Sequence, residues 1–235
     1  MRKILATLAA ALTLLLATAA PLHAQGPTAQ LYAGPRFPGG PDSLRAFLLR
    51  HSLRQVGKGL VFVQFDVLSA DRRQKPHVVL PPGRKALSGA ATAAVLRLVA
   101  DMPAWTPGRQ DDTPITTVTL CLNGASPALA YADEMPVFPG MEPGIIGIYR
   151  YLPNIQVVTP EIVRRKLTGD VYVYFEVSET GLLENARVIG GEVPTLNDAS
   201  LRTVARLPTV ATPPAQLHGQ PVRVYYVISI GFASE

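Results

Sequence analysis

Gly59-Leu-Val-Phe-Val-Gln-Phe-Asp-Val67 and Gly169-Asp-Val-Tyr-Val-Tyr-Phe-Glu-Val177 are two versions of one nine-residue phrase, separated by an offset of 110 residues. Both alternate valine with other side chains and end on an acid followed by valine, a two-residue period that is typical of a β-strand. Their flanks agree as well, because Phe37-Pro-Gly39 precedes the first phrase and Phe138-Pro-Gly140 precedes the second. Self-similarity in order and spacing predicts a duplicated unit of about 90 residues.

Each phrase is surrounded by the same predicted elements, in the order helix, hairpin, helix and strand. Because alternating strands have one fully apolar side, this order predicts an α+β fold with two tandem domains. Each domain is expected to be a three-stranded antiparallel sheet packed with two helices. In the first copy the helices begin at Asp42 and Ser88, and the strands cover 60–68, 76–80 and 114–122. In the second copy the strands cover 169–178, 183–189 and 221–232, and a helix capped near Thr195 or Asn197 covers 196–207.

Composition and the positions of glycine- and proline-containing segments divide the chain into a leader, two domains and two connecting segments. Its 235 residues leave room for a leader and two domains of about 100 residues each. The predicted segments are a signal peptide at 1–24, a connector at 25–35, a first domain at 36–122, a linker at 123–134 and a second domain at 135–235.

The N-terminus predicts export. Arg2 and Lys3 precede an uncharged run, and Ala24 ends a short segment that follows it, as in a secretory signal peptide. The expected location is therefore the periplasm. Leu22 occupies a position where a small residue is preferred, so two alternatives stay open: cleavage near Ala19 or Ala20, or retention of the leader as an inner-membrane anchor.

Charge and cysteine content narrow the class of partner. The formal net charge is +5, with a basic first domain and a second half that has more acids than bases. An exported chain argues against nucleic acid, which leaves an acidic protein, the envelope surface, or a solvated basic face that binds no ligand. Membrane contact is expected only if the leader is retained. Cys121 is the only cysteine, so no intramolecular disulfide forms, and we interpret it as a small buried hydrophobe.

Three phrases of the first copy carry a family resemblance: Phe37-Pro-Gly-Gly40, the strand phrase Val61 to Val67, and Met102-Pro-Ala-Trp-Thr-Pro-Gly108 followed by Pro114. Together they resemble the TonB C-terminal domain in its Bacteroidetes-type form, and the resemblance extends to both copies. It implies a non-enzymatic domain that captures an extended peptide of an outer-membrane receptor by strand addition near its closing strand.

The second copy departs from the family pattern in one loop. It reads Pro208-Thr-Val-Ala-Thr-Pro-Pro214 where the first copy has its tryptophan phrase. Thr159-Pro160-Glu161 lies where the family usually has Tyr-Pro-Glu, before a basic helical turn that includes Arg164.

A complete energy transducer also needs an anchor and a long periplasmic spacer. The 11-residue connector reaches only about 40 Å when fully extended. The sequence therefore predicts a periplasmic TonB-like binding protein, linked to TonB-dependent transport. Two alternatives are an anchored energy transducer and a structural, self-associating envelope protein in which the sheet edges of the two copies pair with each other.

Candidate peptide-binding residues follow from the resemblance and from strand parity. Trp105 is either buried against its own sheet or in contact with the peptide. Tyr225 and Tyr226 face opposite sides of the closing strand, so we expect one to be buried and the other exposed. Tyr172 and Tyr174 share one face and are expected to be half-exposed. The full candidate set is Trp105, Thr159, Pro160, Arg164, Val222, Val224, Tyr225, Tyr226 and Ile228.

We expect no catalytic, cofactor or metal site. His51, His77 and His218 are widely spaced and lie outside any metal-ligand pattern. A combination of Asp42, Ser43 and His51 lacks a nucleophile elbow, and the first two residues fit the start of a helix.

Overall fold

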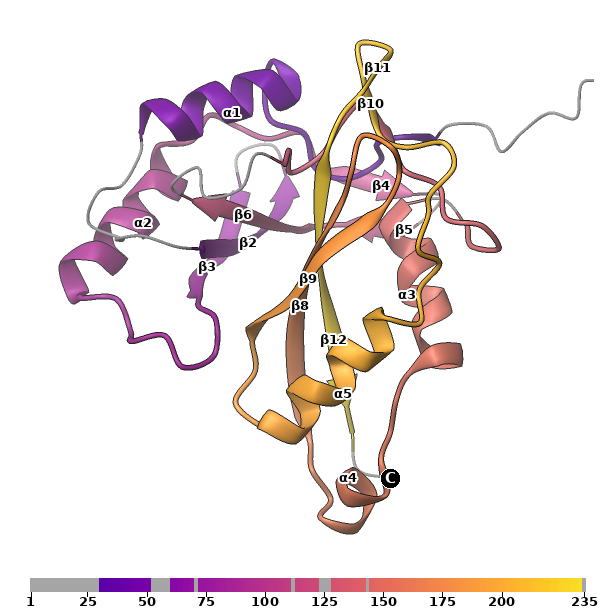
Figure 1. The fold of residues 1–235 in the computed structure, drawn as a ribbon. Helices are drawn as coiled ribbons and strands as arrows, with labels where there is room; N and C mark the ends of the chain where they lie inside the picture. The colour runs from indigo at the N-terminus through magenta and orange to yellow at the C-terminus, as the bar shows by residue number, and fades with distance from the viewer. Residues whose placement is uncertain are drawn as a thin grey trace, which may run out of the picture.

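The computed structural model describes residues 30–51, 60–69, 72–110, 113–122, 128–142 and 144–233 of the chain. Its first half holds an antiparallel sheet with strand order β3-β2-β6, backed by two helices (Figure 1), and a separate hairpin of β4 and β5. The elements of this half are α1 (Gly40–Arg50), β2 (Val61–Ser69), β3 (Arg72–Val79), α2 (Gly89–Asp101), β4 (Gly108–Gln110), β5 (Thr113–Ile115) and β6 (Thr117–Leu122).

Local signals explain where these helices begin. Gly39, at φ 79°, allows a turn in which the Gly40 N–H donates to the Phe37 carbonyl at 2.9 Å. The expected Asp42 cap is wrong, because the N-cap of α1 is Gly39 and Asp42 lies in the first turn. The Ser88 cap is confirmed, since its Oγ accepts a hydrogen bond from the Ala91 N–H at 3.2 Å.

The second half repeats this arrangement, with strand order β12-β8-β9 and helices on one side of the sheet. Gly140, at φ 75°, forms the same turn, in which the Met141 N–H donates to the Phe138 carbonyl at 3.2 Å. The elements are α3 (Gly144–Ile155), α4 (Pro160–Arg164), β8 (Gly169–Val177), β9 (Leu183–Gly190), α5 (Pro194–Val204), β10 (Gln216–Leu217), β11 (Gln220–Pro221) and β12 (Val224–Phe232).

The N-cap of α5 in the second half differs from the predicted one. Thr159 caps α4, with its Oγ1 accepting from the Ile162 N–H at 3.4 Å. The expected cap of α5 at Thr195 or Asn197 is wrong, because the helix begins at Pro194 after Val193. Asn197 instead donates from Nδ2 to the Gly191 carbonyl at 3.2 Å.

A small sheet joins segments that the sequence assigned to the connector and the linker. β1 (Gln30–Leu31) pairs with β7 (Glu134–Met135), and β7 also pairs with β10 of the second half. Leu129, Tyr131 and Ala132 are buried beside it. Residues 128–134, the described part of the chain between the two halves, are therefore part of the packed structure.

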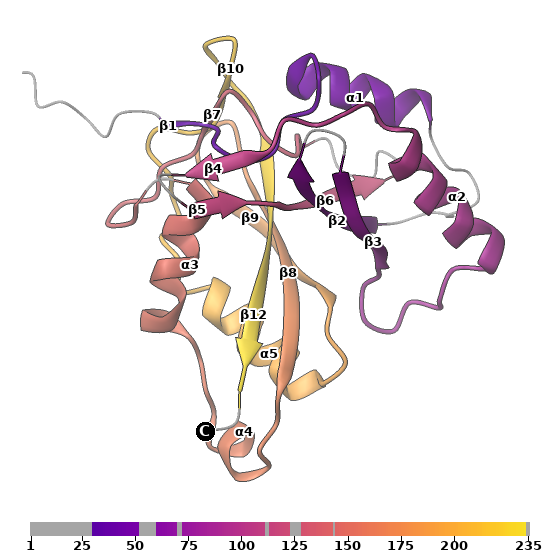
Figure 2. The same ribbon diagram turned by 180° about the vertical axis from the view of Figure 1, so that it is seen from behind.

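The two three-stranded sheets pack face to face, and their strands cross in both views (Figures 1 and 2). Each sheet therefore has a second face that is partly buried, because part of that face is covered by the other sheet. The predicted alternative of edge-to-edge pairing is wrong within this chain, since β6 and β12 belong to separate sheets. The buried residues between the sheets are Phe62, Val79 and Cys121 from the first and Tyr174, Ile189 and Tyr225 from the second.

The opposite faces of the sheets form the main core with the helices. Val61, Val63 and Phe65 of β2 lie on this side, and Val171 and Val173 of β8 do so in the second half. Tyr174 is fully buried and Tyr172 is only partly exposed. Alternate residues of both central strands therefore enter two different cores.

The predicted signal peptide at 1–24 lies outside the described residues. None of the helices in the described ranges combines the length and the apolar character that crossing a bilayer requires.

Candidate functional site

A cavity of about 610 Å³ lies where the two halves meet, beside the closing strands β6 and β12. Its walls come from the segment after β1, from β5 and β6, from the segment around β7, from the start of α3, and from β8 and β12. The lining residues that matter for its chemistry are Tyr32, Trp105, Thr117, Thr119, Tyr131, Tyr149, Tyr172, Tyr225, Tyr226, Val227 and Ser229.

The cavity is electrically neutral. Among the described residues that line it there is no Asp, Glu, Lys, Arg or His. Burial raises the pKa of Tyr225 and Tyr226 above the usual tyrosine range, and burial together with the neighbouring Tyr131 raises the pKa of Tyr32. These phenols therefore stay protonated at physiological pH, and the site favours uncharged groups.

The outward edge of β12 lies along this cavity and is partly covered. Leu129 donates its N–H to the Arg223 carbonyl and accepts from the Tyr225 N–H, at 2.9 and 3.0 Å. Further along, the Tyr149 hydroxyl accepts from the Ser229 N–H at 3.2 Å. Because backbone direction alternates with a period of two, the N–H and C=O of Val227 point to the same outward side.

The outward edge of β12 is therefore open along only part of its length. Gln156 of α3 donates its side-chain N–H to the Gly231 carbonyl at 2.9 Å, which covers the far end of β12. Leu129 covers the near end. The stretch of outward backbone that borders the cavity is centred on Val227 and Ser229.

The outward edge of β6 is closed by a side chain from the other half. The Tyr225 hydroxyl accepts from the Cys121 N–H and donates to the Thr119 carbonyl, each at 3.1 Å. A phenol from β12 thus binds one outward N–H and one outward carbonyl of β6.

The structure brings three of the predicted site residues together. Trp105, Tyr225 and Tyr226 line the cavity, and all three are buried, with 1%, 5% and 5% of their surface exposed. The expectation that one of the two tyrosines is exposed is wrong, because Tyr225 faces the other sheet and Tyr226 faces the main core. Trp105 packs edge-on against Phe37 and Phe65.

The other predicted residues do not line the cavity. Thr159, Pro160 and Arg164 belong to the start of α4, which lies by the C-terminal end of β12 (Figure 1). Val224 and Ile228 are fully buried, and Val222 packs against the main core.

Several lining residues were not among the predicted ones. Tyr32 and Tyr131 stack at 4.4 Å between ring centroids, although they come from the expected connector and linker. Strand parity could have identified Val227 and Ser229 as outward-directed once Tyr225 was chosen. No local sequence pattern marks Tyr149, because its role depends on how α3 packs beside β12.

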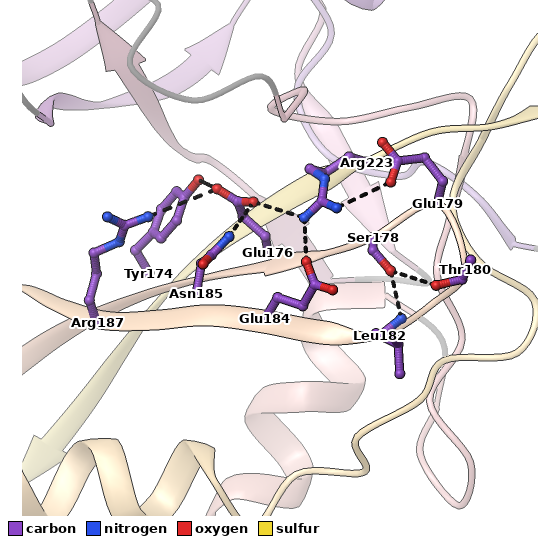
Figure 3. Close-up of polar contacts among 10 residues, drawn as sticks. All are labelled: Tyr174, Glu176, Ser178, Glu179, Thr180, Leu182, Glu184, Asn185, Arg187 and Arg223. Atoms are coloured by element: carbon purple, nitrogen blue, oxygen red, sulfur yellow. Dashed lines mark hydrogen bonds and ion pairs between the residues drawn. The ribbon is translucent and has the colours of Figure 1, made fainter.

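A cluster of charged and polar side chains, separate from the cavity, lies at one end of the second sheet (Figure 3). Glu176, 3% exposed, accepts hydrogen bonds from Tyr174 at 2.5 Å, Asn185 at 2.9 Å and Arg223 at 3.1 Å. Arg223 also binds Glu184 at 2.6 Å and Glu179 at 3.2 Å. Hydrogen bonding to these carboxylates raises the pKa of Arg223, so the guanidinium stays charged.

Arg223→Met is expected to lower the free energy of unfolding by about 2 kcal/mol, because it leaves the Glu176 carboxylate buried without its closest cation. Urea denaturation followed by circular dichroism measures this change. The control is Arg165→Met, which removes an exposed pair with Glu161 and should change stability by less than about 0.5 kcal/mol. Equal effects of the two substitutions would contradict a structural role for the Arg223 cluster.

Asp42, Ser43 and His51 do not form a catalytic triad. Asp42 Oδ2 lies 3.1 Å from Nε2 of His218, while Nδ1 of His51 lies 2.9 Å from the Phe47 carbonyl oxygen. In the described part of the chain, no group of three or more His, Cys, Asp or Glu side chains is placed to hold a metal ion.

Comparison with known families gives one match. The family model for the Gram-negative bacterial TonB protein C-terminal matches residues 160–233, which run from the start of α4 to the end of β12. This family is non-enzymatic and associated with transport. No curated protein and no solved structure is detectably similar to the chain.

Proposed function

We propose that this chain is a periplasmic TonB-like binding protein that recognises an extended segment of an envelope or outer-membrane transport protein by β-strand addition, in TonB-dependent transport. The observation that carries the proposal is the outward backbone of Val227 and Ser229, which borders the cavity. Both residues lie within the segment that matches the TonB family model. Strand addition obtains affinity from main-chain hydrogen bonds and specificity from side-chain pockets beside the edge.

The domain organisation forms part of the same proposal. The first domain covers 36–122 and the second 135–235, joined by a linker at 123–134 and preceded by a connector at 25–35. Equivalent strand orders and the matching turns at Gly39 and Gly140 support two copies of one domain. The family match covers only the second of them.

Each candidate residue has a stated role in this proposal. Trp105, Tyr225 and Tyr226 would shape the pocket that takes a side chain of the incoming segment. Thr159, Pro160 and Arg164 would contact a longer segment that continues past the C-terminal end of β12. Val222, Val224 and Ile228 would hold the closing strand in position, because their side chains face the core.

Val227→Pro tests strand addition directly. Proline removes the outward N–H that a new strand would use, and it is tolerated on an edge strand when that N–H faces away from the sheet. Calorimetric titration with N-terminal peptides of outer-membrane receptors should give micromolar binding to the native chain and binding at least about tenfold weaker for the variant. Val227→Thr keeps the N–H and should bind as the native chain does. Absence of binding to the native chain at high micromolar peptide would overturn the proposal.

Tyr149→Phe is expected to strengthen peptide binding by about two- to fivefold, because the peptide no longer has to displace the Tyr149 hydroxyl from the Ser229 N–H. The same titration measures the gain. Tyr151→Phe, on the same helix but away from the cavity lining, serves as the matched control. Unchanged or weaker binding by Tyr149→Phe would show that the peptide does not use Ser229.

Localisation has its own test. Mass measurement of the chain from the cell-envelope fraction distinguishes a product cut after Ala24 from a chain that keeps its leader. A retained leader would favour the anchored energy transducer. Sedimentation without added peptide distinguishes the periplasmic binding protein and the anchored transducer from a self-associating envelope protein. Only the self-associating protein would form oligomers by itself.

A further inference from the structure

A smaller cavity of about 310 Å³, the α1 cavity, lies between helix α1 and the segment that precedes β7. Pro41, Leu44 and Leu48 line it from one face of the helix, because residues three and four positions apart are neighbours on a helix surface. Leu49 also lines it and is 57% exposed, so the described chain leaves part of this apolar face open to solvent. The volume lies at the lower end of the range for small-molecule sites, which is about 300 to 1,000 Å³.

Polar groups of three residues that line the α1 cavity already have partners within the chain. The Tyr225 hydroxyl binds the Cys121 N–H and the Thr119 carbonyl, each at 3.1 Å. Leu129 uses its N–H and its carbonyl to bind the backbone of β12, at 2.9 and 3.0 Å. A peptide backbone would find none of these groups free, and burying its amides without hydrogen bonds would cost free energy. A hydrocarbon chain has no such amides, so this lining fits an acyl tail better than a peptide.

One cation borders the same space. Among the described residues that line the α1 cavity, Arg45 is the only one with a charged side chain, and it is exposed. Its guanidinium has no hydrogen-bond or ion-pair partner in the described part of the chain. The acid one turn earlier on α1, Asp42, instead has its Oδ2 atom 3.1 Å from Nε2 of His218. Because a guanidinium matches the geometry of a carboxylate, Arg45 is complementary to an anionic head group beside an apolar tail.

We propose that the α1 cavity binds a medium-chain fatty acid, with its tail against the leucines of α1 and its carboxylate paired with Arg45. The tail gains free energy by leaving water, and the small volume limits its length. The carboxylate stays partly hydrated, because Arg45 is exposed. This site does not depend on strand addition, since Val227 does not line it.

Calorimetric titration of the full chain with hexanoate, octanoate and decanoate tests the proposal, at concentrations below those at which each ligand forms micelles. Affinity should rise about fourfold for each added methylene as long as the tail still enters the cavity, because each buried methylene contributes a similar transfer free energy. Decanol, which has the decanoate tail without the charge, is the matched uncharged probe.

Two variants at exposed positions separate the head group from the tail. Arg45→Gln should weaken decanoate binding by about five- to tenfold and change decanol binding by less than about twofold, because only the carboxylate uses the guanidinium. Leu49→Ala should weaken the binding of both ligands alike, by about two- to fourfold. Arg50→Gln is the control, since Arg50 is an exposed cation on the same helix that does not line the cavity, and both affinities should stay unchanged.

Three outcomes would overturn the inference. The first is the absence of saturable binding of any of the three fatty acids below its micelle concentration. The second is an affinity that does not depend on tail length, which means that a carboxylate alone binds the protein surface. The third is an equal loss of decanoate affinity in Arg45→Gln and Arg50→Gln, which means that the ligand responds only to the overall charge of α1. None of these results bears on peptide binding, which Val227→Pro tests separately.

Discussion

Trp105→Ala is expected to lower the free energy of unfolding by about 3 to 5 kcal/mol, the largest effect of any single substitution considered. The side chain is 1% exposed and packs edge-on against Phe37 and Phe65, with ring centroids 5.5 and 5.7 Å away. Alanine removes these contacts and enlarges a cavity that already exists beside the indole. Urea denaturation followed by far-ultraviolet circular dichroism measures the loss, because the variant has no tryptophan fluorescence.

Two controls identify the cause of that loss. Trp105→Phe retains an aromatic ring and removes the unpartnered indole N–H, so it should cost less than half as much. Leu49→Ala, at a position 57% exposed, should change stability by less than about 0.5 kcal/mol. A Trp105→Ala variant as stable as Leu49→Ala would mean that the tryptophan is not part of the core.

Alkaline pH is expected to destabilise the protein by about 3 kcal/mol at pH 11 relative to neutral pH, through Tyr225 and Tyr226 alone. An unfolded tyrosine ionises near pH 10, whereas burial raises the pKa of both residues above that value in the folded state. Their contribution to stability is fully present below the unfolded pKa and is lost as pH rises toward the folded one. Each proton that only the folded state retains costs about 1.4 kcal/mol per pH unit.

The measurement combines urea denaturation at several pH values with the ultraviolet absorbance of ionised tyrosine. Ionisation of the buried phenols should coincide with unfolding, since folding protects them. Tyr226→Phe, which removes a hydroxyl that has no hydrogen-bond partner among the described residues, should reduce the alkaline loss by about half. Stability that is unchanged up to pH 11 would contradict the burial of these phenols.

Much of the local structure could be predicted from the sequence. The repeated phrases became the central strands β2 and β8, and the Ser88 cap is confirmed. These features depend on residues close together in the chain, where spacing and capping chemistry act directly. The capping errors at Asp42 and Asn197 have a local cause too: each helix begins with a proline near its first turn, and no polar side chain occupies the cap position.

The packing between the halves could not be predicted in the same way. Strand parity correctly placed Tyr225 and Tyr226 on opposite faces, but exposure depends on what covers each face. A second sheet covers the face that carries Tyr225, and a one-strand pattern contains no information about that contact. The cavity has the same origin, because its lining extends from Tyr32 to Ser229 along the chain.

The hydroxyl of Tyr225 makes the first half of the chain depend on the second half for its folded structure. It accepts from the Cys121 N–H and donates to the Thr119 carbonyl of β6, and its ring packs in the buried cluster that contains Phe62 and Cys121. A shortened gene that ended before β12 would produce a first half with a bare apolar surface and an unpaired strand border, both of which promote aggregation. The first half therefore depends on the second, and a first half produced alone would need polar substitutions at that surface to stay monomeric.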